Sequence, residues 1–184
     1  MTCIAAIVDN GIIYMGADSA GTSGYEQRLR RDEKIFINND FIMGFTSSFR
    51  MGQLLRYSFK PPKFHADDKD IFAYMATDFV NEVRSCLKSG GYAQSDKGEE
   101  TGGCFLVGHK GRLFEIEDDY QVAEVYESYM AIGSGQSYAI GAFAATEGEP
   151  VKTRLEKALK IAEKFNAGVS GPFNYLTLGE GVTL

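Results

Sequence analysis

The sequence predicts an α+β protein, a four-layer αββα sandwich in which two mostly antiparallel sheets stack and helices flank them. Three observations support this class. Tight-turn residues join consecutive short apolar runs, so neighbouring strands are hairpin partners and the sheets are mostly antiparallel. The order is strands, two helices, strands, two helices and a strand. Four helices can cover both outer faces of two stacked sheets, and 184 residues without an internal repeat fit one domain, residues 1–184.

The chain opens with a predicted hairpin. Thr2–Val8 is apolar and β-branched, and Ile12–Ala17 is a second apolar run. Asp9-Asn10-Gly11 lies between them and is a strong turn signal, because asparagine and glycine tolerate a positive φ. Both runs are almost continuously apolar or small, so both faces of these strands are expected to be buried.

A loop, a second hairpin and a short helix come next. Small residues indicate the loop, and Pro61-Pro62 ends the helix because proline cannot continue it. The elements in order are the loop Ser19–Gly24, the strands Lys34–Ile37 and Phe41–Phe45 around the turn Asn38-Asn39-Asp40, the cap-forming loop Thr46-Ser47-Ser48, and a helix containing Phe49, Leu54 and Leu55.

The second half of the chain contains two amphipathic helices. The clearer one is Asp67–Leu87, where Asp67 and Asp68 suit a helix N-terminus. Its apolar stripe consists of Ile71, Phe72, Met75, Phe79, Val80, Val83 and Leu87. The other elements are a mobile loop over Lys88–Gly103, strands over Cys104–His109, Leu113–Ile116, Tyr129–Ile132 and Phe173–Leu176, a small-residue helix near Gln136–Thr146, and a second amphipathic helix from Pro150 to Phe165.

Composition excludes several classes of function. The net charge of −6 argues against nucleic acid, whose phosphates need a basic surface. No apolar run approaches the roughly 18 residues of a membrane span, and no basic residue precedes the first apolar run as in a secretory signal. Three cysteines and two histidines predict neither a disulfide framework nor a zinc site. The acidic residues around Glu115 and Glu117 lack EF-hand spacing. We expect a cytoplasmic protein with no metal and no cofactor.

Thr2 is the first candidate for chemistry. Methionine is often removed during synthesis when the next residue is small, and removal here would leave a hydroxyl and a free α-amine on one residue. An α-amine titrates near ~7.7–8.0, so it can act as a base at neutral pH without a histidine. Many proteins begin with Met-Thr, so Thr2 by itself does not indicate an enzyme.

Two charged residues stand at strand ends that this topology can bring beside Thr2. Asp18 ends the second predicted strand, and Lys34 begins the third. A buried ammonium near the Thr2 hydroxyl would lower the hydroxyl pKa, and an aspartate would keep that lysine charged. Taken singly, Asp18 is explained as a loop cap and Lys34 as a strand-edge charge. Cys3 is a rival nucleophile, although a buried strand position is the simpler interpretation.

Five ordered motifs resemble the proteasome β-subunit and HslV family of N-terminal nucleophile hydrolases. The resemblance covers Thr2 to Leu55 and Gly133 to about Leu178, and between these the order of elements is similar. The motifs are Thr2-Cys3-Ile4, Gly16-Ala17-Asp18 with Thr22 and Gly24, Lys34-Ile35-Phe36, Gly44-Phe45-Thr46-Ser47-Ser48, and Gly133-Ser134-Gly135.

The resemblance implies a threonine-type peptidase and a role for each matching residue. Thr2 would be the nucleophile and Asp18 and Lys34 would tune it, while Ser134 and Ser170 would hydrogen-bond around its amine. The backbone N–H of Ser47 would be an oxyanion donor. Backbone groups near Thr22 would pair with an extended peptide. Asp32 and Phe45 would line a pocket that selects the substrate side chain.

The resemblance also implies partners. They are a polypeptide substrate, further copies of this chain in a homo-oligomeric ring, and an ATP-dependent unfoldase that would feed the ring. Neither nucleic acid nor a membrane is implied.

Two departures from the family pattern leave alternatives open. Ser47 stands where the family usually has glycine, and Ala167, beside Asn166, stands where its proteasome branch has aspartate. Both favour a catalytically inactive, ring-forming structural subunit of the same fold. Against it stand Thr2, Asp18, Lys34 and Ser134 together. A third class is an amidase acting on small molecules, although such enzymes more often begin with cysteine or serine.

Overall fold

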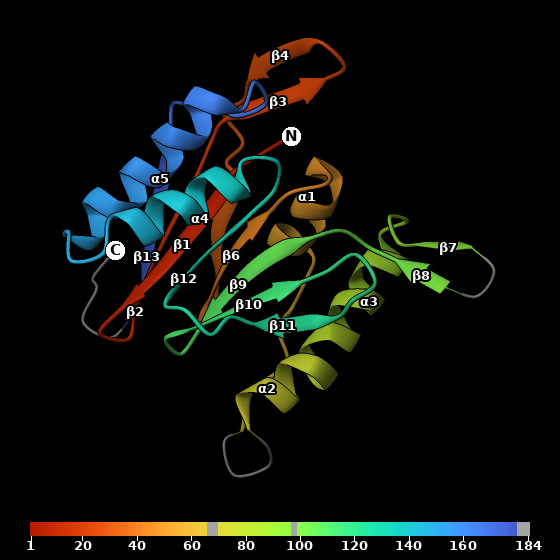
Figure 1. Ribbon diagram of the computed structural model, residues 1–184. Helices are drawn as coiled ribbons and strands as arrows, with labels where there is room; N and C mark the ends of the chain where they lie inside the picture. Colours follow the sequence, from red (N-terminus) through yellow and green to blue (C-terminus); the bar gives the residue numbers. More distant parts are fainter. Residues whose placement is uncertain (66–69, 97–98, 180–184) are drawn as a thin grey trace.

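The computed structural model describes residues 1–65, 70–96 and 99–179, with the side chains of 94–99 left aside. Two sheets lie at its centre and helices cover both outer faces (Figure 1). No helix in these ranges is long and apolar enough to cross a membrane. The helices are α1 (Phe49–Tyr57), α2 (Ile71–Tyr74), the π-turn η1 (Met75–Phe79), α3 (Val80–Ser89), α4 (Gln136–Ala145) and α5 (Val151–Phe165).

The first sheet has the strand order β12-β1-β2-β13 and is antiparallel throughout. The predicted opening hairpin is confirmed, and Asn10 and Gly11 of its turn have φ values of 50° and 78°. Ile4 lies opposite Ala17 on one neighbour and Ile132 on the other, so the residue after Cys3 is held at the sheet's centre. The strands are β1 (Ile4–Asp9), β2 (Ile12–Ala17), β12 (Tyr129–Ile132) and β13 (Asn174–Leu178).

The second sheet has the order β11-β10-β9-β6-β5 and is also antiparallel. Its two predicted hairpins are present, and β6 pairs with β9 to join them. Gly44 in β6 faces the first sheet, where a Cβ would lie 3.0 Å from the Met15 sulfur. The strands are β5 (Ile35–Asn38), β6 (Phe41–Phe45), β9 (Phe105–His109), β10 (Arg112–Ile116) and β11 (Val122–Glu124).

Three apolar clusters between four layers confirm the αββα sandwich. One packs α1 to α3 against the second sheet, and Phe41, Phe79 and Phe105 are among its members. Another packs α4 and α5 against the first sheet. The third lies between the sheets and includes Ile4 and Ile42. Alternate residues of β1 enter the second and third clusters, so both faces of this strand are buried, as its continuous apolar sequence predicts.

Two predicted loops contain strands, so these predictions were wrong. The Ser19–Gly24 segment forms β3 (Ala20–Ser23), which pairs with β4 (Glu26–Leu29) in a hairpin that projects beside the N-terminus (Figure 1). Every residue of β4 is exposed, so its sequence has no apolar alternation to reveal it. The predicted mobile loop contains β7 (Gln94–Asp96) and β8 (Glu99–Thr101), and part of it lies outside the described residues.

The predicted Asp67–Leu87 helix begins later than expected. Asp67 and Asp68 lie outside the described residues, and the side chain of Asp70 caps the helix by accepting from the backbone N–H groups of Phe72 and Ala73. The π-turn adds a residue to the helical repeat, and this extra residue rotates α3 relative to α2. Phe72 is 40% exposed, contrary to its place in the predicted stripe, whereas Phe79 beyond it is fully buried.

Candidate active site

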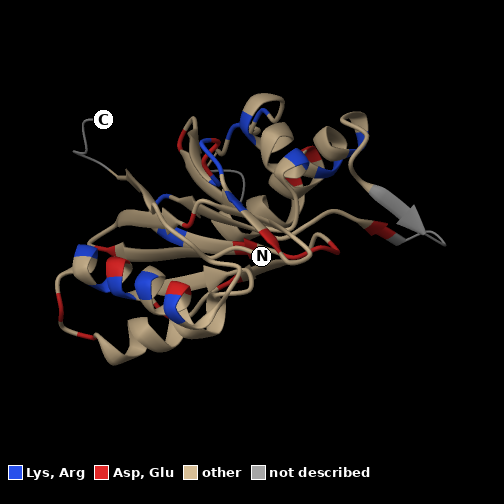
Figure 2. Cartoon of the chain, turned by 90° about the horizontal axis from the view of Figure 1, so that it is seen from above, with Lys and Arg blue, Asp and Glu red and all other residues tan. Residues whose placement is uncertain are grey.

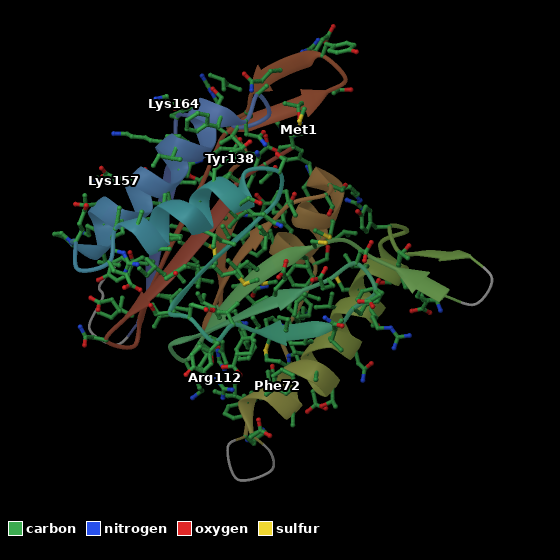
Figure 3. The ribbon with its side chains drawn as sticks, viewed as in Figure 1. Met1, Phe72, Arg112, Tyr138, Lys157 and Lys164 are labelled. Atoms are coloured by element: carbon green, nitrogen blue, oxygen red, sulfur yellow. The ribbon has the colours of Figure 1, made fainter. Side chains whose placement is uncertain are left out.

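Thr2 lies just before β1, where three separate segments of the chain converge. Its side chain is buried, and its backbone N–H donates to the hydroxyl of Ser134 at 3.2 Å. Its hydroxyl donates to the Met1 carbonyl at 2.6 Å. Met1 is 57% exposed and lies beside the β3–β4 hairpin (Figure 3). Met1 is therefore largely exposed, whereas Thr2 is buried.

Asp18 and Lys34 form a buried ion pair next to Thr2. Lys34 Nζ donates to Asp18 Oδ1 at 2.8 Å, and the two side chains are 0% (Asp18) and 1% (Lys34) exposed. The same oxygen accepts the backbone N–H of Cys3 at 2.9 Å. The other carboxylate oxygen accepts the N–H of Ala20 at 3.0 Å. Because Cys3 follows Thr2 directly, the carboxylate that pairs with Lys34 is hydrogen-bonded to the residue next to Thr2.

Burial shifts the pKa values of two groups at this point. Desolvation lowers the pKa of Lys34 below its ordinary value, and the attraction of Asp18 opposes that shift. Desolvation, assisted by the negative charge of Asp18, raises the pKa of Cys3 to about 12. A thiol with such a pKa is almost never ionised at neutral pH, which counts against Cys3 as the rival nucleophile.

The serine of the Gly133-Ser134-Gly135 motif is oriented by Asn166. The Ser134 hydroxyl donates to Asn166 Oδ1 at 3.2 Å, and Asn166 Nδ2 donates back to the Ser134 carbonyl at 2.6 Å. Gly133 has a φ of 91° and packs against Thr2, so that a Cβ there would clash with the Thr2 carbonyl. Asn166 was not among the predicted site residues. Its only sequence signal was its position beside Ala167, where the family pattern has an aspartate.

Ser170 lies beside Asp18, which it contacts through its backbone. Its backbone N–H donates to Asp18 Oδ2 at 3.4 Å, and its carbonyl accepts from the N–H of Ser19 at 2.9 Å. Through its backbone, Ser170 thus helps to hold the carboxylate that pairs with Lys34. The predicted contact of its side chain with the amine stays a prediction.

Ser47 adopts a left-handed backbone conformation, with a φ of 62°. Glycine enters this region more easily than serine does, so the glycine that the family resemblance implies at this position would suit the same backbone conformation. The Ser47 hydroxyl accepts the backbone N–H of Cys104 at 3.1 Å, a bond that glycine would lack. Within the described chain, the backbone N–H of Ser47 has no hydrogen-bond partner.

Thr22 lies in β3 with its backbone polar groups directed away from β4. The Ser19 carbonyl accepts the N–H of Arg30 at 2.9 Å, which makes this a hydrogen-bonded pair of the hairpin. Hydrogen-bonded pairs alternate along antiparallel strands, so the Thr22–Gln27 pair is a non-bonded one. The outer edge of β3 is unpaired among the described residues, and Thr22 presents its N–H and C=O along it.

Asp32 and Phe45, the two other residues predicted to bind substrate, are connected through Arg30 and Phe49. Asp32 forms a hydrogen-bonded ion pair with Arg30 at 2.6 Å, and the Arg30 guanidinium stacks on the Phe49 ring at 3.7 Å. Phe49 meets Phe45 edge to face at 5.7 Å. Phe45 itself is buried against α1, so the exposed part of this surface is formed by Arg30 and Phe49, which carry no distinguishing signal in the sequence.

The comparisons with known proteins support the fold. No protein-family model and no curated protein matches the sequence. Among solved structures, Thiobacillus denitrificans BPH has a TM-score of 0.78 at 21% identity, over 96% of this chain and 97% of that chain. A second BPH structure holds epoxomicin, with a TM-score of 0.78 at 20% identity, over 96% and 97% of the two chains.

Two further structures come from other organisms. Eukaryotic HslV from Trypanosoma brucei has a TM-score of 0.67 at 18% identity, over 97% of this chain and 99% of that chain. Anbu, an ancestral β-subunit from Yersinia bercovieri, has a TM-score of 0.64 at 16% identity, over 96% of this chain and 81% of that chain. At these identities the likeness establishes the fold, and the predicted proteasome-like N-terminal nucleophile fold is confirmed.

Proposed function

We propose that this chain is a threonine-type peptidase whose nucleophile is Thr2, once processing has removed Met1. The observation that carries the proposal is the buried Lys34–Asp18 pair at 2.8 Å, which shares its carboxylate with the backbone of the residue after Thr2. A buried ion pair gives little net stability, so its retention next to a candidate nucleophile favours a catalytic use. Ser134, within hydrogen-bond distance of the Thr2 nitrogen, adds a partner for the exposed amine.

The proposed reaction needs no group from outside the chain except water. The Thr2 hydroxyl oxygen bonds to the substrate carbonyl carbon while its proton passes to the Thr2 amine. The C–N bond breaks, the departing amine takes that proton, and an ester to Thr2 remains. Water then attacks the ester with the same amine as base, which releases the acid and restores the hydroxyl. Lys34 stabilises the negative charge that develops on the hydroxyl oxygen.

Two backbone positions would bind the substrate. The free N–H of Ser47 would donate to the oxyanion, and the serine side chain leaves that donor intact. The unpaired edge of β3 at Thr22 would accept the peptide as an added strand, with main-chain hydrogen bonds that suit many sequences. Both roles agree with what the family resemblance implies for these residues.

We also propose that the protein acts as a homo-oligomer. Helix α4 carries no charged residue, whereas basic and acidic residues interleave along α5 (Figure 2). On the outside of α4, Tyr138 is 41% exposed and stacks on Phe165, which is 59% exposed, at 5.7 Å. Exposed apolar residues gathered in this way are typical of subunit interfaces. An ATP-dependent unfoldase remains a proposal from the family resemblance alone.

Intact-mass spectrometry tests the proposed function directly. Protein from its native host should lack Met1, and incubation with epoxomicin should add one inhibitor mass that peptide mapping places on Thr2. Epoxomicin is the appropriate probe because BPH, which shares the fold, has been solved in complex with it. An unmodified chain that retains Met1 and hydrolyses no peptide would instead favour the inactive ring-forming subunit.

We expect Asn166→Ala to lower kcat roughly tenfold with KM unchanged, because Asn166 orients Ser134 and makes no proposed contact with substrate. The measurement is steady-state hydrolysis of a fluorogenic peptide. Asn166→Asp separates the two contacts with Ser134, since a carboxylate can still accept from the Ser134 hydroxyl and the Gly168 N–H but cannot donate to the Ser134 carbonyl. Equal kcat values for wild type and Asn166→Ala would show that Asn166 has no role in catalysis.

A further inference from the structure

A cavity of about 390 Å³ lies beside the proposed nucleophile, and none of the predicted site residues lines it. It lies between β12 and the first turn of α4 on one side and β10 on the other. Gly133, part of its wall, is so near Thr2 that a Cβ on it would lie 3.4 Å from the Thr2 Cβ. Thr46 and Cys104, on the opposite wall, adjoin and hydrogen-bond Ser47. Residues of the cavity wall therefore adjoin both the nucleophile and the proposed oxyanion donor.

The walls of this cavity combine an apolar surface with two carboxylates. Met130, Ile132 and Ile140 supply apolar surface, while Glu115 and Glu117 supply negative charge. Both glutamates are half-buried, and within the described residues neither forms an ion pair or a side-chain hydrogen bond. Burial, together with the smaller repulsion of Glu117, raises the pKa of Glu115. Two neighbouring carboxylates without a cation favour a positively charged occupant.

The chemistry of the walls distinguishes a side chain from a metal ion. Over the described part of the chain, no group of three histidine, cysteine or acidic side chains converges as a metal site requires. A lysine or arginine has a long apolar stem below its charged group, and such side chains lay the stem on apolar surface while the charge meets a polar partner. The apolar floor and the acidic wall match the two halves of that side chain.

We infer that this cavity binds a lysine or arginine side chain of the substrate, on the side of the scissile bond that leaves as the amine. The inference rests on the proposed peptidase function. The acyl half of the substrate is assigned to the edge of β3 at Thr22 and to the surface around Arg30 and Phe49, and none of these residues lines the cavity. The cavity with Glu115 and Glu117, whose wall residue Gly133 packs against Thr2, is therefore assigned to the departing half.

Internally quenched peptides that share one acyl half test this assignment. Their first residue after the scissile bond is lysine, norleucine or glutamate, and norleucine has the stem of lysine without its charge. Wild type should cleave the lysine peptide with a kcat/KM roughly tenfold above the norleucine peptide, and the glutamate peptide least. In Glu115→Gln/Glu117→Gln the ratio of lysine to norleucine should fall to about one, as charge-pairing predicts.

A matched control and a second substrate keep the two proposals apart. Glu147→Gln removes one exposed carboxylate in the α4–α5 connection and should leave the preference unchanged. A peptidyl-coumarin substrate has a coumarin amine in place of an amino acid after the scissile bond, so its hydrolysis by wild type reports the proposed peptidase function without reporting a preference for lysine. Cleavage of this substrate with no preference for lysine would overturn the inference alone. If wild type cleaves neither class of substrate, the proposed function fails and the inference fails with it.

Discussion

Thr2→Ala is expected to abolish peptide hydrolysis, with a loss of kcat/KM on the order of 10⁴-fold or more, because it removes the only atom proposed to bond to the substrate. Alanine is also small, so Met1 should still be removed and the amine should still be exposed. The substitution deletes one hydroxyl, which donates to the Met1 carbonyl, from a buried side chain. Fluorogenic peptide assays and thermal unfolding should therefore show an inactive protein with a nearly unchanged Tm.

Cys3→Ala is the matched control, one residue away. The Cys3 thiol is buried with a pKa of about 12 and packs among apolar residues below α4 and α5. Its loss should leave kcat/KM within about threefold of wild type, with a stability cost of about 1 kcal/mol for the small cavity. The reverse pattern, an active Thr2→Ala and an inactive Cys3→Ala, would identify the thiol as the nucleophile and contradict the proposal.

The central layers were predictable because local signals and burial agree there. Asn10-Gly11 in the first turn and the continuous apolar runs of β1 and β2 specify the same buried hairpin. The two apolar stripes that predict amphipathic helices do pack on opposite outer faces of the sheets. In these segments each residue's own preference is also what the tertiary structure requires.

The β3–β4 hairpin was not predictable for a physical reason. The residues of β4 all face solvent, so no alternation marks the strand, and Gly21 and Gly24 are typical of a loop. What holds the hairpin is non-local: Gln27 donates to the Ala167 carbonyl at 3.1 Å, and the N–H of Ser19, just before β3, donates to the Ser170 carbonyl at 2.9 Å. A contact between residues 140 positions apart leaves no trace in a window of sequence.

The same distinction applies to the candidate site. The sequence alone could indicate Thr2, Asp18 and Lys34. A hydroxyl residue and two charged residues are unusual at the ends of strands that are expected to be buried. Asn166 could not, because an amide at a helix end is an ordinary cap until Ser134, 32 residues away, is placed against it. The sequence resemblance pointed to this position only as a missing aspartate at Ala167, and the neighbouring amide makes the contact to Ser134.

Lys34→Met is expected to combine a large loss of stability with a loss of activity. Methionine keeps much of the length of the side chain but leaves the carboxylate of Asp18 buried without its cation, which typically costs about 3–5 kcal/mol of unfolding free energy. Thermal unfolding should show a Tm lower by roughly 10 °C. Lys157→Met is the control, because the Lys157–Glu149 pair at 2.7 Å is partly exposed and its loss should cost at most about 1 kcal/mol.

Temperature separates the structural role of Lys34 from its catalytic one. Well below its Tm, Lys34→Met is folded, and its kcat/KM should still be reduced by about 10²–10⁴-fold if the ammonium tunes the Thr2 hydroxyl. The remaining N–H donors of Cys3, Ala20 and Ser170 would still hold Asp18 and the strand ends in place. If activity returned to the wild-type value on cooling, Lys34 would serve only to stabilise the fold. Persistent inactivity in a folded protein, beside a fully active Lys157→Met, would place the buried charge in the reaction itself.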